Sequence, residues 1–182
     1  YPVVKNELLD QEDSNHAWES AMGAAATKIK GASSLAILLS PNLSCEDAWL
    51  LCELVKSVDP EAFIGLGDIP IKGEDKKFKS GFVVRSEKVP NARGVQTVSQ
   101  NILNMKDWQN KVSDSDVVIV TGNYPESWET PTIHDEQFLI LIDTLPNSLT
   151  ERADVFLPAA TWAEKAGTFE NVNNILQTFE QA

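Results

Sequence analysis

The segment "SLAILLSPNLSCEDAWLLCELVKSV", residues 34–58, is the most informative about the fold because it predicts a buried strand followed by an amphipathic helix. Its first seven residues form a short apolar run, which is typical of a strand buried on both faces of a sheet. Ser44 is a candidate N-cap, and Asp47 three residues later completes a capping-box-like start of a helix. The apolar residues of that helix share one face, which predicts packing against the sheet. They are Ala48, Leu51, Cys52, Val55 and Val58.

Four further apolar runs predict four more strands. They are "AFIGLG" (62–67), "DVVIVTG" (116–122), "FLILID" (138–143) and "ADVFL" (153–157). A helix is expected from about His16 to Lys30, with Trp18, Met22, Ala25 and Ile29 at helical spacing, and one or two helical turns within residues 98–112. Apolar strands alternating with helices indicate an α/β fold with a Rossmann-like open, mainly parallel sheet and helices on both faces. We therefore expect residues 1–182 to form a single α/β domain.

The connection of residues 68–94 is polar, basic and dotted with glycines. A connection of this length is uncommon in a compact domain and is usually functional or mobile. We expect one short strand in it, at Phe82–Arg85. Its basic cluster is diluted by acidic neighbours, which favours a solvated loop. The cluster consists of Lys72, Lys76, Lys77 and Lys79.

The net charge of the chain limits the classes of molecule that it is expected to bind. Among 182 residues, 27 are acidic and 15 are Lys or Arg, a net charge of −12. Such a field repels phosphate backbones, so the sequence predicts no nucleic-acid binding. The sequence contains no apolar run of about 18 residues, so no direct membrane insertion is expected. Because the chain begins at Tyr1, we interpret it as a fragment of a larger protein.

Residues that could carry catalysis or hold a metal form no recognised grouping. Cys45 and Cys52 lie too far apart on one helix to bridge each other, and no metal site is expected from them. Neither His16 nor His134 has a nucleophile at a recognised spacing, and no G-x-S-x-G segment occurs. The glycines at 65 and 67 make no dinucleotide fingerprint, because Pro70 stands where its third glycine belongs. The sequence predicts no complete active site.

A ligand site of an open parallel sheet lies beyond the carboxyl ends of its strands. The predicted strands deliver Gly122, Asn123 and Asp143 to this rim. Thr161 and Glu164 then form an S/T-x-x-E box, which predicts a short helix stopped by Gly167. Its first amides can hold a phosphate or be satisfied by the box itself, and the residues alone favour the second reading. Asp143 likewise can bind a guanine edge or ribose hydroxyls, or cap a loop.

The segment "ADVFLPAATWAEKAGTFEN", residues 153–171, resembles the signature of the molybdopterin oxidoreductases. Three weaker matches are similar to the large iron–sulfur subunit of NADH-quinone oxidoreductase, respiratory complex I: "NHAWESAMGAAATKIK" (15–30), "LSPNLSCEDAWLLCELVKSV" (39–58) and "VPNARGV" (89–95). The resemblance covers most of the chain. It implies a large parent polypeptide with iron–sulfur clusters near its N-terminal end. Layered α/β domains follow, which in catalytic members hold molybdopterin guanine dinucleotide.

The resemblance also names candidate residues for that cofactor. Asp143 matches the strand-end aspartate of the pattern Q-D-x-x-x-T-x-T-A, which lies near guanine in cofactor-binding members. Asn147 and Leu149 replace its two threonines, and residues 173–177 lack the glycine and arginine of E-G-R-x-Q. These departures weaken the polar site. If a guanine dinucleotide is bound, the candidate contacts are Gly122, Asn123, Asp143 and Glu164.

Two functions follow from the resemblance. The first is a non-catalytic scaffold domain of the NADH-quinone oxidoreductase large subunit, supporting electron transfer from NADH to quinone. It implies no cofactor or metal in this chain, iron–sulfur clusters in the parent, and contacts with other domains and subunits. Its location would be cytoplasmic, peripheral to the inner membrane. The alternative is a cofactor-binding domain of a formate-dehydrogenase-type molybdoenzyme; a free-standing nucleotide-binding protein ranks third.

Overall fold

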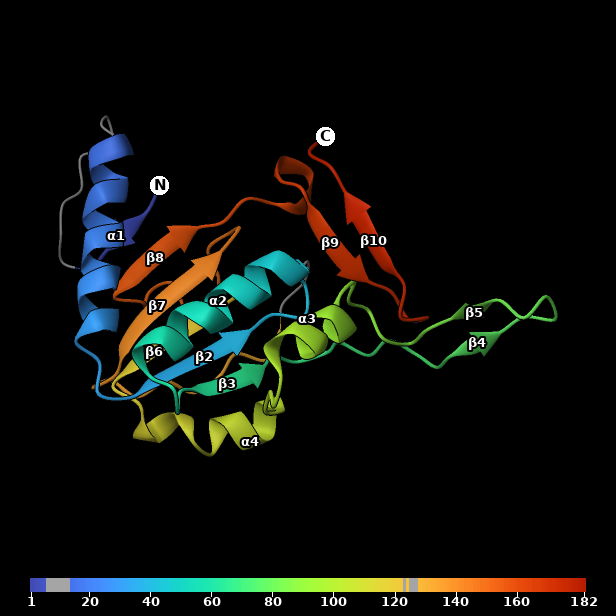
Figure 1. Cartoon of the computed structure of the whole chain (residues 1–182), viewed down its shortest axis with the longest axis horizontal. Helices are drawn as coiled ribbons and strands as arrows, with labels where there is room; N and C mark the ends of the chain where they lie inside the picture. The colour runs from blue at the N-terminus through green and yellow to red at the C-terminus, as the bar shows by residue number, and fades with distance from the viewer. Residues whose placement is uncertain (6–13, 123, 125–127) are drawn as a thin grey trace.

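The computed structural model describes residues 1–5, 14–122, 124 and 128–182. Its centre is a six-stranded sheet in the order β1-β8-β7-β6-β2-β3 (Figure 1). The strands are β1 Val3–Val4, β2 Leu35–Leu39, β3 Phe63–Leu66, β6 Val117–Thr121, β7 Phe138–Asp143 and β8 Val155–Pro158. All neighbouring pairs are parallel except β1, which runs antiparallel to β8 at one edge. All five predicted strands are confirmed, and the antiparallel edge strand is an addition.

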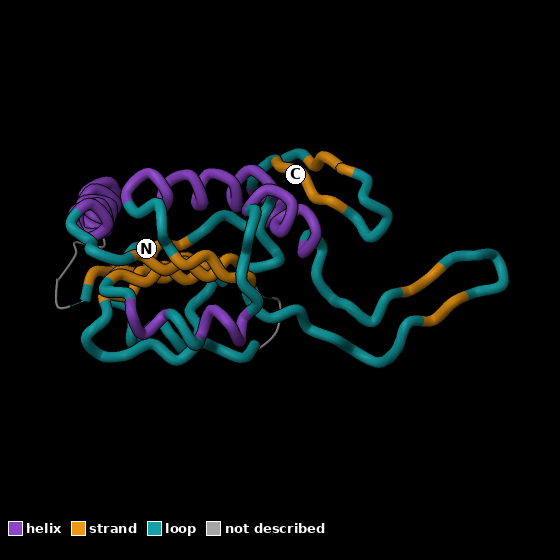
Figure 2. The backbone as a smooth tube through the Cα atoms, turned by 60° about the horizontal axis from the view of Figure 1, so that its bottom comes forward, coloured by secondary structure: helices purple, strands orange, loops and turns teal. Residues whose placement is uncertain are grey.

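Helices cover both faces of the sheet, as the sequence predicts. They are α1 Ser14–Lys30, α2 Cys45–Val58, α3 Ala92–Ser99 and α4 Met105–Gln109, followed by the 3-10 turn η1 Val112–Asp114. Figure 2 shows α1, α2 and α3 on one side of the sheet and the short α4 on the other. The fold is therefore α/β with a mainly parallel sheet. No helix in the described part of the chain is long and apolar enough to cross a membrane.

The strand order reverses once, between β2 and β6. From β2 the chain first adds β3 on one side and then returns to add β6, β7 and β8 on the other. In open α/β sheets, this reversal leaves a crevice at the carboxyl ends of the two central strands, where ligands bind. The candidate site is therefore located by topology alone, at the ends of β2 and β6.

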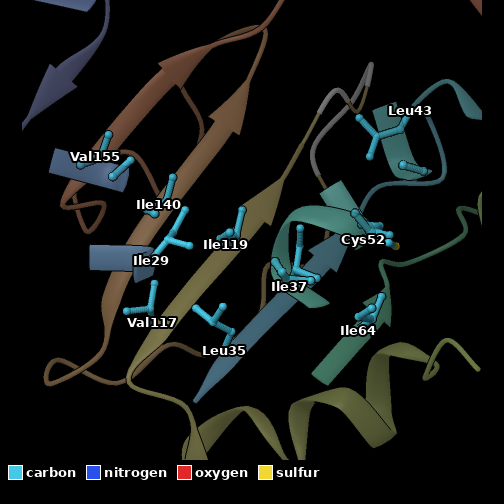
Figure 3. Packing of buried hydrophobic residues seen from close by; sticks show 14 of the residues in the cluster. Ile29, Leu35, Ile37, Leu43, Cys52, Ile64, Val117, Ile119, Ile140 and Val155 are labelled. Carbon is cyan, nitrogen blue, oxygen red and sulfur yellow. The ribbon is translucent and has the colours of Figure 1, made fainter. Parts of the chain in front are cut away.

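The core lies between the sheet and its helices. Every residue of β2 and β6 is buried, as expected for central strands covered on both faces. Figure 3 shows Ile37, Ile119 and Ile140 of three neighbouring strands facing Ile29 of α1 and Cys52 of α2. Cys52 is thus a core residue, as predicted. Burying one aliphatic side chain such as that of Ile37 stabilises the folded state by about 1.5–3 kcal/mol.

The apolar residues at helical spacing in α1 divide between its two faces. Ala25 and Ile29 are buried, whereas Trp18 and Met22 are 38% and 52% exposed. Ala17 and Ala21 complete the buried face. Small alanine side chains let the helix lie close against β1 and β8, which it contacts. The helical spacing predicted the helix correctly, and two of its four apolar residues belong to the buried face.

Two hairpins stand outside the main sheet. One is formed by β4 (Lys76–Lys77) and β5 (Val83–Val84), so the short strand predicted at Phe82–Arg85 is confirmed. The other pairs β9 (Gly167–Glu170) with β10 (Leu176–Phe179) and lies against α2 and α3. The sequence did not predict this second hairpin. It also placed the end of the long connection at Gly94, whereas α3 already begins at Ala92.

Candidate functional site

The carboxyl ends of β6, β7 and β8 meet at one rim, as predicted. An ideal Cβ placed on Gly122 would lie 1.6 Å from Oδ2 of Asp143, so the two residues touch. Asp143 pairs with Pro158 in the register of β7 and β8, and the backbone N–H of Ala159 donates to the carbonyl of Asp143 at 2.8 Å. Asn123, another of the four candidate cofactor contacts, lies outside the described residues. The topology therefore brings Gly122, Asp143 and the segment after Pro158 together.

The carboxylate of Asp143 is engaged by the loop that follows it. The side chain is buried, and its Oδ1 accepts a hydrogen bond from the Thr144 backbone N–H at 2.6 Å. Its Oδ2 accepts one from the Asn147 side-chain amide at 2.6 Å. Asn147 is the residue that replaces the first threonine of the family pattern, and its Oδ1 accepts from the Leu149 N–H at 2.8 Å. Asp143 therefore holds the shape of its own loop.

The switch point between β2 and β6 is tied together by a hydroxyl group. Oγ1 of Thr121 accepts a hydrogen bond from the Ser40 backbone N–H at 2.7 Å and donates to the Leu38 carbonyl at 3.1 Å. Thr121 and Ser40 are both fully buried. The last residue of β6 thus satisfies backbone groups at the end of β2.

Tyr124 fills the space beside the end of β3. Its hydroxyl donates to the Asp68 carbonyl at 3.1 Å, and its ring stacks on Trp128 with centroids 4.5 Å apart. An ideal Cβ on Gly67 would lie 2.4 Å from the Tyr124 oxygen, so only glycine leaves room for this ring. Burial raises the pKa of the Tyr124 phenol above its usual value. Sequence reasoning missed this residue; the small Gly67 at a strand end was the available signal.

In the S/T-x-x-E box after β8, Thr161 and Glu164 hydrogen-bond to each other. A 3-10 turn, η2, spans Trp162–Glu164. Oε2 of Glu164 accepts hydrogen bonds from both the backbone N–H and the hydroxyl of Thr161, each at 2.8 Å. These bonds lower the pKa of the Glu164 carboxyl. The predicted short helical turn is confirmed, and the amide at its start is occupied by its own glutamate.

Gly167 has another role than the one predicted from the sequence. It begins β9 and is absent from the residues with positive φ, so it is not a left-handed helix stop. An ideal Cβ there would lie 2.8 Å from both Phe179 and Ser44. Glycine at this position lets the C-terminal hairpin pack closely on the start of α2.

A cavity of about 530 Å³ lies above the rim. Its polar lining includes Asn42, Lys88, Thr144, Thr161 and Lys165, and its apolar lining includes Leu145 and Trp162. Both lysines already have partners. The ammonium group of Lys165 pairs with Asp47, and that of Lys88 donates to the Arg85 carbonyl. The volume is in the range of small-molecule sites, but the cationic groups are held by the protein.

Metal-binding groups do not gather in the described part of the chain. No three His, Cys, Asp or Glu residues there lie close enough together to hold a metal ion. Cys45 and Cys52 are buried as free thiols, and burial raises the pKa of each. Two separated thiols of this kind do not fit an iron–sulfur cluster, which takes a set of cysteine thiolates.

Comparison with known families identifies the matched region. The model of the family described as molybdopterin oxidoreductase matches residues 109–182, which contain β6, β7, β8, the rim and the C-terminal hairpin. No curated protein matches the chain. The match supports the resemblance to molybdopterin oxidoreductases that the segment after β8 indicated, and with it an oxidoreductase-type function.

Proposed function

We propose that this chain is a non-catalytic α/β scaffold domain of the large subunit of an NADH-quinone oxidoreductase. In that role it supports electron transfer from NADH to quinone without holding a redox group itself. The observation that carries the proposal is that the polar groups at the rim bind one another. Asp143 is engaged by Thr144 and Asn147, and Thr161 by Glu164.

Guanine dinucleotide fits this rim poorly. A carboxylate recognises guanine by accepting two N–H bonds from the base edge, and at Asp143 these bonds would compete with those from Thr144 to Oδ1 and from Asn147 to Oδ2. A phosphate needs backbone amides at a helix start, and the Thr161 amide is taken by Glu164. An internal hydrogen bond that such a ligand displaced would offset part of the binding free energy, because the bond lost and the bond gained contribute similar amounts.

The scaffold role leaves redox groups and neighbours to the rest of the parent complex. We expect iron–sulfur clusters in other parts of the parent, and contacts with its other domains and subunits. Exposed tryptophans offer such contacts: Trp18 is 38%, Trp49 49% and Trp162 69% exposed. Large aromatic side chains are enriched where proteins meet. The proposed location is the cytoplasmic side, peripheral to the inner membrane.

One observation favours the alternative function. The cavity above the rim is large enough for part of a nucleotide, and two of the candidate cofactor contacts, Gly122 and Asp143, touch each other at the rim. A cofactor-binding domain of a formate-dehydrogenase-type molybdoenzyme would use this space for molybdopterin guanine dinucleotide.

A thermal-shift titration with GDP separates the two functions. The scaffold proposal expects an unchanged melting temperature up to millimolar GDP, with ADP as the matched nucleotide control. The alternative expects a rise with GDP alone, since a ligand at a hundred times its Kd adds about 2.7 kcal/mol. A second measurement is the molybdenum and guanine content of the longer parent protein, where stoichiometric amounts of both would reject the scaffold role.

A further inference from the structure

The hairpin of residues 72–88, which we call the arm, projects from the domain. Figures 1 and 2 show it extending away from the sheet and its helices. At its base the backbone N–H of Lys72 donates to the Ser86 carbonyl at 2.8 Å, and that of Lys88 to the Pro70 carbonyl at 2.8 Å. At its tip the N–H of Phe78 donates to the Phe82 carbonyl at 2.8 Å. The arm is thus hydrogen-bonded from its base to its tip.

The arm is held in shape by one carboxylate. Asp75 accepts hydrogen bonds from the Ser86 backbone N–H at 2.8 Å, the Arg85 guanidinium at 2.7 Å and the Ser86 hydroxyl at 2.9 Å. These bonds lower the pKa of Asp75 to about 2. A two-stranded hairpin without a packed face is at best marginally stable in water. A projecting hairpin with this much internal bonding presents its side chains to something outside the domain.

The chemistry of the arm is apolar at the tip and basic along its length. Phe78 and Phe82 are 51% and 64% exposed, with ring centroids 6.0 Å apart. Residues 72–88 contain six Lys or Arg and three acidic residues, a net charge of +3, which leaves −15 on the rest of the chain. An exposed aromatic pair beside lysines matches a surface that is apolar and acidic.

The outer face of α2 has this complementary chemistry. Trp49, Leu50 and Leu54 are 49%, 58% and 43% exposed. Glu46 and Glu53 are exposed on the same side of the helix, and each lies three or four residues from both Trp49 and Leu50. Glu46 also accepts a hydrogen bond from the Thr168 N–H at 2.9 Å, and its charge remains at the surface. The side chains of this face point away from the sheet, whose contacts use the opposite, buried face of the helix.

We propose that the arm binds the outer face of α2 of a second copy of this chain. Phe78 and Phe82 would cover Trp49 and Leu50, and the lysines of β4 would lie near Glu53. The arm leads away from its own α2 in Figure 1, so the contact forms between copies. Two copies that exchange arms make the same contact twice, which gives a closed two-fold dimer. This inference does not depend on the scaffold role.

Sedimentation equilibrium of the whole chain tests the proposal. We expect a concentration-dependent dimer that weakens as sodium chloride is raised, because the charged part of the contact is screened. The double variant Phe78→Ser/Phe82→Ser should raise the dissociation constant at least about tenfold, as for loss of central aromatic anchors. The control Ile175→Ser/Leu176→Ser, at equally exposed positions of the C-terminal hairpin, should leave it unchanged.

Mixing two variants, each lacking one side of the contact, then tests whether α2 is the surface that the arm binds. Leu50→Ser/Leu54→Ser should weaken the dimer as strongly as the arm variant. A mixture of the arm variant with the α2 variant should associate more tightly than either alone, because one intact arm then meets one intact face. Circular dichroism of each variant reports whether it is folded.

Three results would overturn the proposal. The chain could stay monomeric at every concentration, or the mixture could associate no better than its parts. The arm could also bind heparin or anionic vesicles while the chain does not self-associate, which would make a polyanion or a lipid surface its partner.

Discussion

The rim of the sheet and the arm differ in what their side chains contact. At the rim, polar side chains are hydrogen-bonded within the chain: Thr121 to the end of β2, Asp143 to its own loop and Glu164 to Thr161. On the arm, the backbone is paired internally while Phe78 and Phe82 face outward. The groups at the rim are thus bonded within the chain, whereas the aromatic side chains of the arm remain open to solvent.

A polar cluster in a sequence can therefore mean two different things. The polar residues behind β8 look like a ligand site, yet they stabilise the backbone around them. The lysines of the arm look like a solvated loop, yet an ordered hairpin presents them. Substitutions in each region test this contrast.

The largest effect is expected for Gly122→Ala. The new Cβ would lie 1.6 Å from Oδ2 of Asp143, so the carboxylate has to leave its position and lose its bonds. We expect the free energy of unfolding to fall by about 2–4 kcal/mol in urea denaturation, from overpacking and lost hydrogen bonds together. Gly23→Ala is the matched control, since nothing lies within 4 Å of its ideal Cβ. Equal stability of the two variants would contradict a tightly closed rim.

Thr121→Val is expected to have the next largest effect. Valine keeps the shape of the side chain but removes the oxygen that accepts from the buried Ser40 N–H. Leaving that donor unpaired should cost about 1–3 kcal/mol in unfolding free energy. Thermal denaturation measures this variant beside Val120→Thr, which places a hydroxyl on the neighbouring buried position. The pair distinguishes the loss of the Thr121 hydrogen bond from the cost of burying a hydroxyl group. A neutral Thr121→Val would mean that the switch point is not tied by this hydroxyl.

Removing the exposed rings of the arm should barely change stability. Phe78→Ser/Phe82→Ser alters side chains that the body of the domain does not cover, so we expect the unfolding free energy to change by less than about 0.5 kcal/mol per site. Urea denaturation at protein concentrations below dimer formation measures this change. A loss of several kcal/mol would show that the arm is part of the folding core.

The smallest and most local effect is the acid response of the arm. The pKa of Asp75 is lowered to about 2 from a usual 3.8 by hydrogen bonds from Ser86 and Arg85. A lowered pKa means that its stabilising contribution is complete above the usual value and is lost as the pH falls towards 2. NMR titration should show arm resonances shifting in that window. Arg85→Gln should move the transition to higher pH, and an unmoved transition would exclude the guanidinium as a cause.

Much of the fold was predictable because its strands are short and continuously apolar. The runs at residues 35–39, 117–121 and 138–143 became central strands, and Ser44 caps α2 through a bond from the Asp47 N–H at 3.2 Å. Local patterns of this kind need no knowledge of distant partners. The spacing of apolar residues in α1 did not by itself show that Ala25 and Ile29 are buried while Trp18 and Met22 are exposed.

The site was predictable in position but only partly in content. Parallel topology is enough to bring Gly122 and Asp143 together, and the box of Thr161 and Glu164 follows from its spacing. The bonds of Tyr124 beside the end of β3 and of Thr121 at the switch point join residues 56 and 81 positions apart along the chain, which a single sequence does not reveal. The cofactor role of the rim residues stays a prediction, as does the contribution of Asn123, outside the described part.

The central claim is that the rim is closed by the chain's own groups, and two-dimensional NMR of the amide signals during a GDP titration tests it most directly. The account predicts that the signals of Gly122, Thr144 and Thr161 stay in place at millimolar GDP. Saturable shifts of these three signals together, with ADP giving none, would show that the rim opens for guanine and would contradict the account.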